Sequence, residues 1–275
     1  MAHHWGYRKC KKGKEEVLDP QEWGKEFPIA IHGKRQSPID IKTSEIEYNP
    51  SLGKLKFDYD PKSIKNVVNN GHTFTVSVAQ TDENDITGGP LEHKYELAQF
   101  HCHWGSKDDI GSEHTVNGKQ YSAELHFVHW NTDLYKSCGD AIDKENGIAV
   151  LGTFIKVGEH HKYWDRILPY LNKVLHKGQS ADIKFPDDEG FKASEILPTN
   201  TKDYYTYDGS LTTPPLYETV TWILFKEPVE ISQKQMDVFR SLKSTEKDEE
   251  EQQCMSDNYR PTMAQHRRTV KASFK

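Results

Sequence analysis

The chain has 275 residues, of which 36 are Lys or Arg and 42 are Asp or Glu, so its formal net charge is −6. Eleven Phe, 13 Tyr and six Trp can build a hydrophobic core and argue against a disordered chain. The mildly acidic balance argues against a nucleic-acid partner, because phosphate binding needs a basic face. No stretch approaches the roughly 18 apolar residues of a membrane span, so we expect no membrane partner.

Four cysteines are scattered along the chain without a CxxC pair, and the polar, basic N-terminus does not resemble a signal peptide. In a domain of this size without such a leader, free thiols are the default. We therefore predict a cytoplasmic protein in which Cys10, Cys102, Cys138 and Cys254 are reduced.

The chain begins with a charge-rich segment, residues 9–16, that is predicted to be an exposed loop. Several later segments alternate apolar and polar side chains with period two, as half-buried strands do, and turn residues bound them. Residues 148–157 form a short apolar run that is typical of a buried strand. The alternating segments are residues 74–78, 95–104, 122–130 and 218–225.

Two helices are predicted in the second half of the chain. Residues 164–176 carry an apolar stripe at helical spacing, although Pro169 within it must start or kink the helix. Residues 233–242 follow a capping box formed by Ser232 and Gln235.

A second charge-rich segment, residues 244–253, is predicted to be another exposed loop. Strands greatly outnumber helices, and no linker or internal repeat divides the sequence. We therefore predict a mainly β fold. It is a single domain over residues 1–275, built around a large, mostly antiparallel twisted sheet with short helices on its periphery.

Three of the 14 histidines are spaced as a metal site would require. On one predicted strand, Gln99, His101 and His103 face the same side, because side chains two residues apart share a face. On another predicted strand, Glu124 and His126 share a face in the same way. If these strands are antiparallel neighbours, His126 can meet the other two histidines across the sheet.

Three neutral imidazoles on a rigid sheet would hold one Zn²⁺ per chain and leave a fourth position for water. That is the pattern of a catalytic zinc site rather than a structural one. Gln99 and Glu124 lie two residues from ligands and could accept their second N–H groups. An isolated H-x-H pair on a strand is a weak signal, so a structural role stays open on these residues alone. His129 faces away from His126 and is predicted to be a core histidine.

At these two strands the chain resembles the α-class carbonic anhydrases, and those of the cytosolic type most closely. The resemblance covers almost the whole chain and implies a sheet of about ten strands, with a conical pocket that reaches zinc at its centre. Several segments that carry the resemblance are specific to that family. They are residues 23–28 (WGKEFP), 35–40 (RQSPID), 69–72 (NNGH), 88–91 (GGPL), 111–116 (GSEHTV), 210–215 (SLTTPP) and 271–275 (KASFK).

The resemblance implies a role for individual residues. It implies three zinc ligands, a hydrogen-bonding partner for each ligand, a pair that orients the attacking oxygen, and a histidine that shuttles protons. In that order they are His101, His103 and His126; Gln99, Asn258 and Glu124; Thr212 and Glu113; and His72. It also implies a pocket for carbon dioxide and a set of residues that order water. They are Val128, Val150, Leu211, Thr213, Val220 and Trp222 for the pocket, and Tyr7, Asn70 and Thr75 for the water.

The implied activity is the reversible hydration of carbon dioxide to bicarbonate and a proton by a zinc-bound hydroxide, which would serve pH regulation. Weak esterase activity and inhibition by sulfonamides are also implied. We expect a monomer whose partners are carbon dioxide, bicarbonate and water. Two alternatives stay open: a catalytically silent carbonic-anhydrase-like interaction protein, and a zinc hydrolase of esters or peptides. The chain keeps all three ligand histidines and has no H-E-x-x-H motif.

The chain departs from the family pattern at several positions. Cys102 stands between two ligands where relatives commonly have Phe, and strand alternation points it away from the metal into the core. Thr75 stands where relatives often have Asn, and Tyr259 stands where many have Trp. Residues 132–146 also differ and are expected to border the pocket, so inhibitor preference cannot be inferred from the family.

Overall fold

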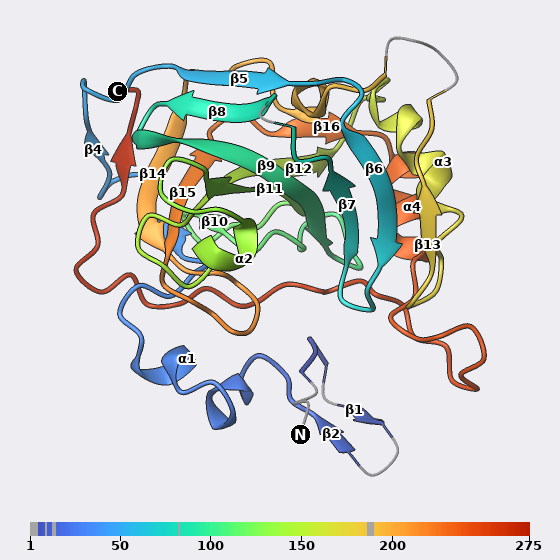
Figure 1. Ribbon diagram of the computed structural model, residues 1–275. Coiled ribbons are helices and arrows are strands. Elements are labelled where there is room, and N and C mark those ends of the chain that lie inside the picture. The colour runs from blue at the N-terminus through green and yellow to red at the C-terminus, as the bar shows by residue number, and fades with distance from the viewer. Residues whose placement is uncertain (1–4, 9, 13–14, 82, 186–189) are drawn as a thin grey trace.

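The computed structural model describes residues 5–8, 10–12, 15–81, 83–185 and 190–275. Within these ranges one twisted sheet of 13 strands dominates, and the helices are short (Figure 1). From edge to edge, the sheet runs β13 (Ser180–Asp182), β6 (Ile64–Asn69), β7 (Phe74–Val78), β9 (Leu91–Trp104), β11 (Ala123–Asn131), β12 (Ile148–Val157), β15 (Val220–Phe225), β14 (Tyr204–Gly209), β17 (Lys271–Ala272) and β4 (Glu47–Tyr48). Off this path, β16 (Val229–Ile231) pairs with β12, and β5 (Leu55–Tyr59) pairs with β8 (Asn84–Gly88), which also pairs with β9.

Most neighbouring strands are antiparallel, which confirms the predicted sheet. The exceptions are β12, which runs parallel to β15 and β16, and β17, which runs parallel to β4. Eight of the ten residues of β12 are buried in succession, as expected for a strand covered on both faces. The sheet has 13 strands, more than the ten or so that the family resemblance implied, and four of them are only two or three residues long.

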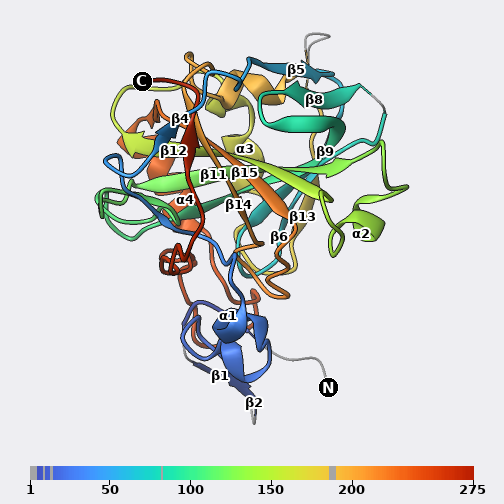
Figure 2. The same cartoon turned by 90° about the vertical axis from the view of Figure 1, so that its left-hand side faces the viewer.

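Two small strand pairs lie outside the large sheet. β3 (Asp40–Ile41) runs parallel to β10 (Thr115–Val116), and β1 (Cys10–Lys12) pairs antiparallel with β2 (Glu15–Val17). The predicted loop over residues 9–16 is therefore wrong for the described part of that segment, because backbone pairing does not require apolar alternation. This N-terminal hairpin lies at one end of the molecule, beyond the large sheet (Figure 2). The predicted loop at residues 244–253 is confirmed.

The helix predicted at residues 233–242 is confirmed as α4 (Gln233–Ser241). Its capping box is complete, because the Ser232 side chain accepts from the Gln235 N–H and the Gln235 side chain accepts from the Ser232 N–H.

The helix predicted at residues 164–176 is wrong. The segment folds instead as the 3-10 turn η2 (Trp164–Arg166) followed by the single turn α3 (Leu168–Leu171). Pro169 lies in the first turn of α3, and it lacks the N–H that would continue a helix from η2. The remaining helical turns are η1 (Trp23–Lys25), α1 (Ile29–His32), α2 (Cys138–Ala141) and η3 (Ala193–Ile196).

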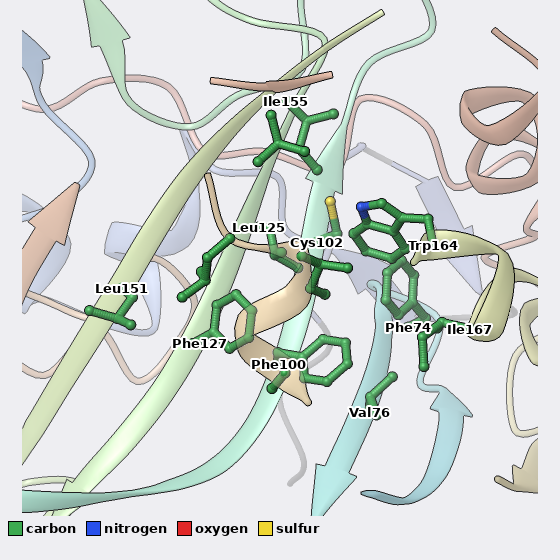
Figure 3. Packing of buried hydrophobic residues seen from close by; sticks show 14 of the residues in the cluster. Phe74, Val76, Phe100, Cys102, Leu125, Phe127, Leu151, Ile155, Trp164 and Ile167 are labelled. Carbon is green, nitrogen blue, oxygen red and sulfur yellow. The ribbon is translucent and has the colours of Figure 1, made fainter. Parts of the chain in front are cut away.

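Hydrophobic side chains pack in two large clusters beside the central strands. The larger cluster holds Phe74, Phe100 and Phe127 together with Cys102, which is fully buried as predicted (Figure 3). The second cluster holds Trp130, Val150 and Trp222, among others. Because side chains alternate along β9, the residues between those of the larger cluster face the other side of the sheet.

Three cysteines, Cys102, Cys138 and Cys254, are free thiols, as predicted. The side chain of Cys10 lies outside the described residues. None of the helices in the described ranges is long and apolar enough to cross a membrane.

Candidate metal centre

Three histidine rings meet at the centre of the sheet. β9 and β11 are antiparallel neighbours as predicted, and their register sets His126 opposite His101, two residue pairs away from His103. The ring centroids lie 4.8–5.2 Å apart. One nitrogen atom from each ring lies within 4.8 Å of the others. The register of two strands therefore brings the three rings together.

A polar partner fixes the second nitrogen of each ring. The Nδ1–H of His101 donates to Gln99 Oε1 at 2.9 Å, and that of His103 donates to the Asn258 carbonyl at 2.7 Å. The remaining Nε2 of both rings then carries a lone pair.

On the other strand, the Nε2–H of His126 donates to Glu124 Oε1 at 2.7 Å. This leaves Nδ1 of His126 as the nitrogen with a lone pair. Side chains two residues apart on a strand share a face. Gln99 and Glu124 therefore lie beside the histidine rings, as their spacing in the sequence predicted.

Burial favours the neutral form of His101 and His103. It lowers the pKa of His101 well below its ordinary value, and the neighbouring histidines lower it further. Burial also lowers the pKa of His103, although Glu113 opposes this. Burial alone would raise the pKa of Glu124, but His114 and His126 outweigh it and hold that pKa well below its usual range. Neutral imidazoles are the form that binds a metal.

Two buried polar atoms beside the three rings have no hydrogen-bond partner within the described ranges. They are His103 Nε2 and Glu113 Oε2, which lie 3.4 Å apart. Leaving such atoms unsatisfied costs free energy. A cation held by the three lone pairs would satisfy the imidazole nitrogen, and imidazole donors suit Zn²⁺. The residues present therefore fit a zinc ion with three protein ligands.

A chain of hydrogen bonds extends behind Glu124. Its Oε1 accepts from His114 Nδ1 at 2.7 Å, and His114 Nε2 accepts from the Tyr207 hydroxyl at 2.6 Å. The Tyr207 oxygen in turn lies 2.8 Å from Ser37 Oγ. No local sequence pattern points to His114 or Tyr207 as a functional residue, because the two lie 93 positions apart in the chain.

The structure does not join Thr212 and Glu113 by a hydrogen bond, since Glu113 Oε2 has no partner among the residues described. Glu113 Oε1 accepts from the backbone N–H of Arg260 at 2.8 Å, and the Glu113 N–H donates to Glu124 Oε2. Thr212 is buried at 5% exposure. The Glu113 carboxylate is thus held through one oxygen, and its other oxygen is open to a donor.

His72 lies at the edge of the site, stacked on Trp5 with ring centroids 4.0 Å apart and planes 9° apart. It lines a pocket of about 210 Å³ together with Trp5, Tyr7 and Lys177. The Tyr7 ring lies between two histidines, 6.4 Å from His72 and 6.3 Å from His103. Burial, and then the charge of Lys177, lower the pKa of His72 to about 4, so the ring is neutral at neutral pH.

The residues expected to form the carbon dioxide pocket gather beside His126. The Trp222 ring lies 4.8 Å from that of His126, and Val150 pairs with both Val128 and Trp222 in the sheet. Of the five apolar residues, Val150, Val220 and Trp222 belong to the second cluster, and Val128 and Leu211 pack against it. Cys138, from the segment expected to border the pocket, packs against the same cluster.

The remaining predicted residues occupy backbone turns or the sheet. Asn70 Oδ1 accepts from the N–H groups of His72 and Thr73, so this oxygen caps a turn. Thr75 lies opposite His101 in the β7–β9 pairing, and the Thr213 carbonyl accepts from the Leu216 N–H.

Residues 18–274 match the family model of the eukaryotic-type carbonic anhydrases. The chain therefore belongs to the eukaryotic-type carbonic anhydrase family, which confirms the resemblance found in the sequence. Among known proteins it is similar to carbonic anhydrase 7 of Homo sapiens. The two are 44% identical over 274 residues, which cover 99% of this chain and 98% of that protein.

Proposed function

We propose that the protein catalyses the reversible hydration of carbon dioxide to bicarbonate and a proton, with one zinc ion held by His101, His103 and His126. The observation that carries this proposal is the convergence of one nitrogen lone pair from each of three imidazoles, of which that of His103 Nε2 is buried and has no partner among the described residues. Membership of the carbonic anhydrase family supports it.

When bound, zinc would supply a Lewis acid that makes water nucleophilic near neutral pH. The chain's own residues prepare its site. Gln99, Asn258 and Glu124 each accept the N–H of one ring, which fixes the tautomer and turns the lone pair toward the centre.

The substrate is small, uncharged and nonpolar. An apolar wall beside the metal centre suits it, because such a wall excludes competing polar ligands without binding carbon dioxide so tightly that its reaction slows. We propose that this wall is formed by Val128, Val150 and Trp222, with Leu211, Val220 and Thr213.

Thr212 and Glu113 are proposed to orient the attacking oxygen. The Thr212 oxygen is directed to accept a hydrogen bond from that attacking oxygen when its own O–H donates elsewhere. Glu113 Oε2 is open to accept it, and the Arg260 N–H fixes the carboxylate through Oε1.

His72 is proposed to carry the proton from the metal centre to bulk water. In its position stacked on Trp5 the ring is neutral, which is the form that accepts a proton. The nearby charge of Lys177 favours the release of that proton. Tyr7, Asn70, Thr75 and Thr213 are proposed to order the water between the site and His72.

We further propose a cytoplasmic monomer that takes part in pH regulation, has weak esterase activity and is inhibited by sulfonamides.

The activity is tested by stopped-flow hydration of carbon dioxide against pH, on the purified protein before and after zinc is removed and restored. We expect hydration that requires zinc and rises with pH through the neutral range. Folded, zinc-loaded protein without hydration would instead support a silent interaction protein, and faster turnover of esters than of carbon dioxide would support a zinc hydrolase.

A further inference from the structure

The side chain of Asn69, at the end of β6, joins three separate parts of the chain. It is fully buried. Its Oδ1 accepts from the Gly71 N–H at 2.9 Å. Its Nδ2 donates to the carbonyls of Val174 and Leu175, which follow α3, and of Lys243, which precedes the loop of residues 244–253, at 3.0–3.2 Å. One carboxamide thus fixes the start of the turn that carries His72.

The rest of that turn is held equally firmly. Asn70 Oδ1 accepts from the His72 N–H at 2.8 Å, and Asn258 Nδ2 donates to the His72 carbonyl at 2.9 Å. Gly71 has φ of +86°, a conformation that other residues rarely adopt. The imidazole of His72, by contrast, has no hydrogen bond to any described residue and is held by stacking on Trp5. The backbone therefore determines where the ring lies.

We propose that Asn69 is a positioning residue for proton transfer, because it holds the backbone of His72 where the ring can receive a proton from the site. This inference rests on the proposed role of His72 as the shuttle. Without the carboxamide, three buried carbonyls lose a donor and the turn loses its first tie. A small displacement of a group that transfers protons lowers the rate steeply.

The test compares Asn69→Ala with a matched control, Asn84→Ala. Asn84 is also fully buried and also ties a turn, because its carboxamide contacts the Asp60 N–H, the Ala79 carbonyl and Thr81 Oγ1, but it belongs to β8, away from the turn of His72. Both variants are expected to be less stable than the wild type. This pair separates loss of stability from loss of positioning.

The readout is carbon dioxide hydration in weak buffer, where proton transfer limits kcat. Asn69→Ala is expected to lower kcat about tenfold while kcat/KM for carbon dioxide changes little. Imidazole added as an external proton carrier should restore kcat. Asn84→Ala should change neither parameter. Equal losses of kcat and kcat/KM in the folded Asn69 variant would overturn the inference. If that variant does not fold, Asn69→Ser, which keeps a polar group, is measured in the same way.

A second readout does not depend on activity. The stacking on Trp5 should shift the ring protons of His72 upfield in NMR spectra of the wild type. This shift is expected to shrink in the Asn69 variant and to persist in Asn84→Ala. An unchanged shift together with an unchanged kcat would exclude a positioning role.

His72→Ala separates the failure of this inference from failure of the proposed shuttle. If His72→Ala leaves kcat in weak buffer unchanged, the shuttle itself is wrong, and the inference falls with it. If His72→Ala lowers kcat but Asn69→Ala does not, only the inference is wrong. When both changes are combined, kcat should equal that of His72→Ala alone, because Asn69 acts through His72.

Discussion

At the scale of single residues, Glu124 carries the largest share of the site's hydrogen bonds. Its carboxylate accepts from the rings of His114 and His126 and from the backbone N–H groups of Glu113 and His114. Four donors require an ionised acceptor with both oxygens available. Any side chain with fewer acceptor positions must leave one of these donors unsatisfied.

Replacing Glu124 by Gln is therefore expected to weaken zinc binding by about 10- to 100-fold, because the amide N–H₂ cannot accept from a ring. Competition with a chelator of known affinity measures this. Glu96→Gln is the control, since Glu96 is also buried but accepts from the Thr81 N–H. Equal zinc affinity in wild type and Glu124→Gln would contradict the assigned tautomer of His126.

His129 shows how a buried histidine affects stability away from the metal. Its Nδ1–H donates to the Phe127 carbonyl at 3.0 Å, and its Nε2 accepts from the Tyr59 hydroxyl at 2.8 Å. The core position predicted for it is confirmed. Burial lowers its pKa to about 3, although hydrogen bonds to backbone carbonyls oppose the shift.

The unfolded chain therefore binds a proton on His129 at a pH where the folded chain does not. The stability contributed by the neutral ring is complete above about pH 6.5 and is lost as the pH falls toward about 3. Urea denaturation is measured from neutral pH down to about 4.5. The unfolding free energy of wild type should fall more steeply with pH than that of His129→Gln, and the difference in slope corresponds to at most one proton bound on unfolding. Parallel curves for the two proteins would refute this.

At the scale of elements, the two residues of the α4 capping box, Ser232 and Gln235, differ in the number of hydrogen bonds that they make. Ser232 Oγ accepts from the Gln235 N–H at the N-terminal end of the helix. Gln235 is buried, and besides closing the box it donates to the His161 carbonyl and to Asp165 Oδ1 and accepts from the His161 N–H.

Ser232→Ala is expected to lower the unfolding free energy by about 1 kcal/mol, which is typical for loss of an N-cap. Gln235→Ala should lower it more, because it leaves buried groups of the segment before η2 without partners. Denaturant titrations of both variants measure the difference. If Ser232→Ala lowered the unfolding free energy more than Gln235→Ala, the N-cap hydrogen bond would contribute more to stability than the contacts with His161.

The elements also show how far the sequence predicts this fold. Residues 74–78 and 148–157 have the predicted bounds, because alternation or a continuous apolar run is a local signal. No continuous helix forms over residues 164–176, but Pro169 lies in the first turn of α3, in agreement with the prediction that it starts or kinks the helix. The pairing of β1 with β2 could not be predicted, because backbone hydrogen bonds leave no mark in a charged sequence.

The site shows the same contrast between features with a local sequence signal and features that depend on tertiary packing. The ligand strands and the partners Gln99 and Glu124 follow from side chains two residues apart. The positions of His114 and Tyr207 do not, because tertiary packing joins segments that are far apart in the chain. The roles proposed for Asn258 and His72 came only from the family resemblance, since neither residue lies in a pattern that points to its function.

At the scale of the whole molecule, the core does not depend on the metal. The two hydrophobic clusters consist of side chains other than the three ligand histidines. Removing zinc should therefore lower Tm, because zinc binds the folded state in preference to the unfolded state, but the zinc-free protein should stay folded. Calorimetry and near-UV circular dichroism with a chelator measure this. Loss of the near-UV spectrum on chelation would show that the metal is needed for folding.

The long separation between His103 and Asn258 affects how the protein matures. The carbonyl that orients this ring lies 155 positions further along the chain than the ring itself. During synthesis, all three ligand histidines leave the ribosome well before that carbonyl is made. A nascent chain can therefore expose its imidazoles, but it cannot yet fix the tautomer of His103 through the Asn258 carbonyl. At the proposed zinc site, tight metal uptake would therefore await the synthesis of Asn258, and zinc loading would be a late step in the maturation of the protein.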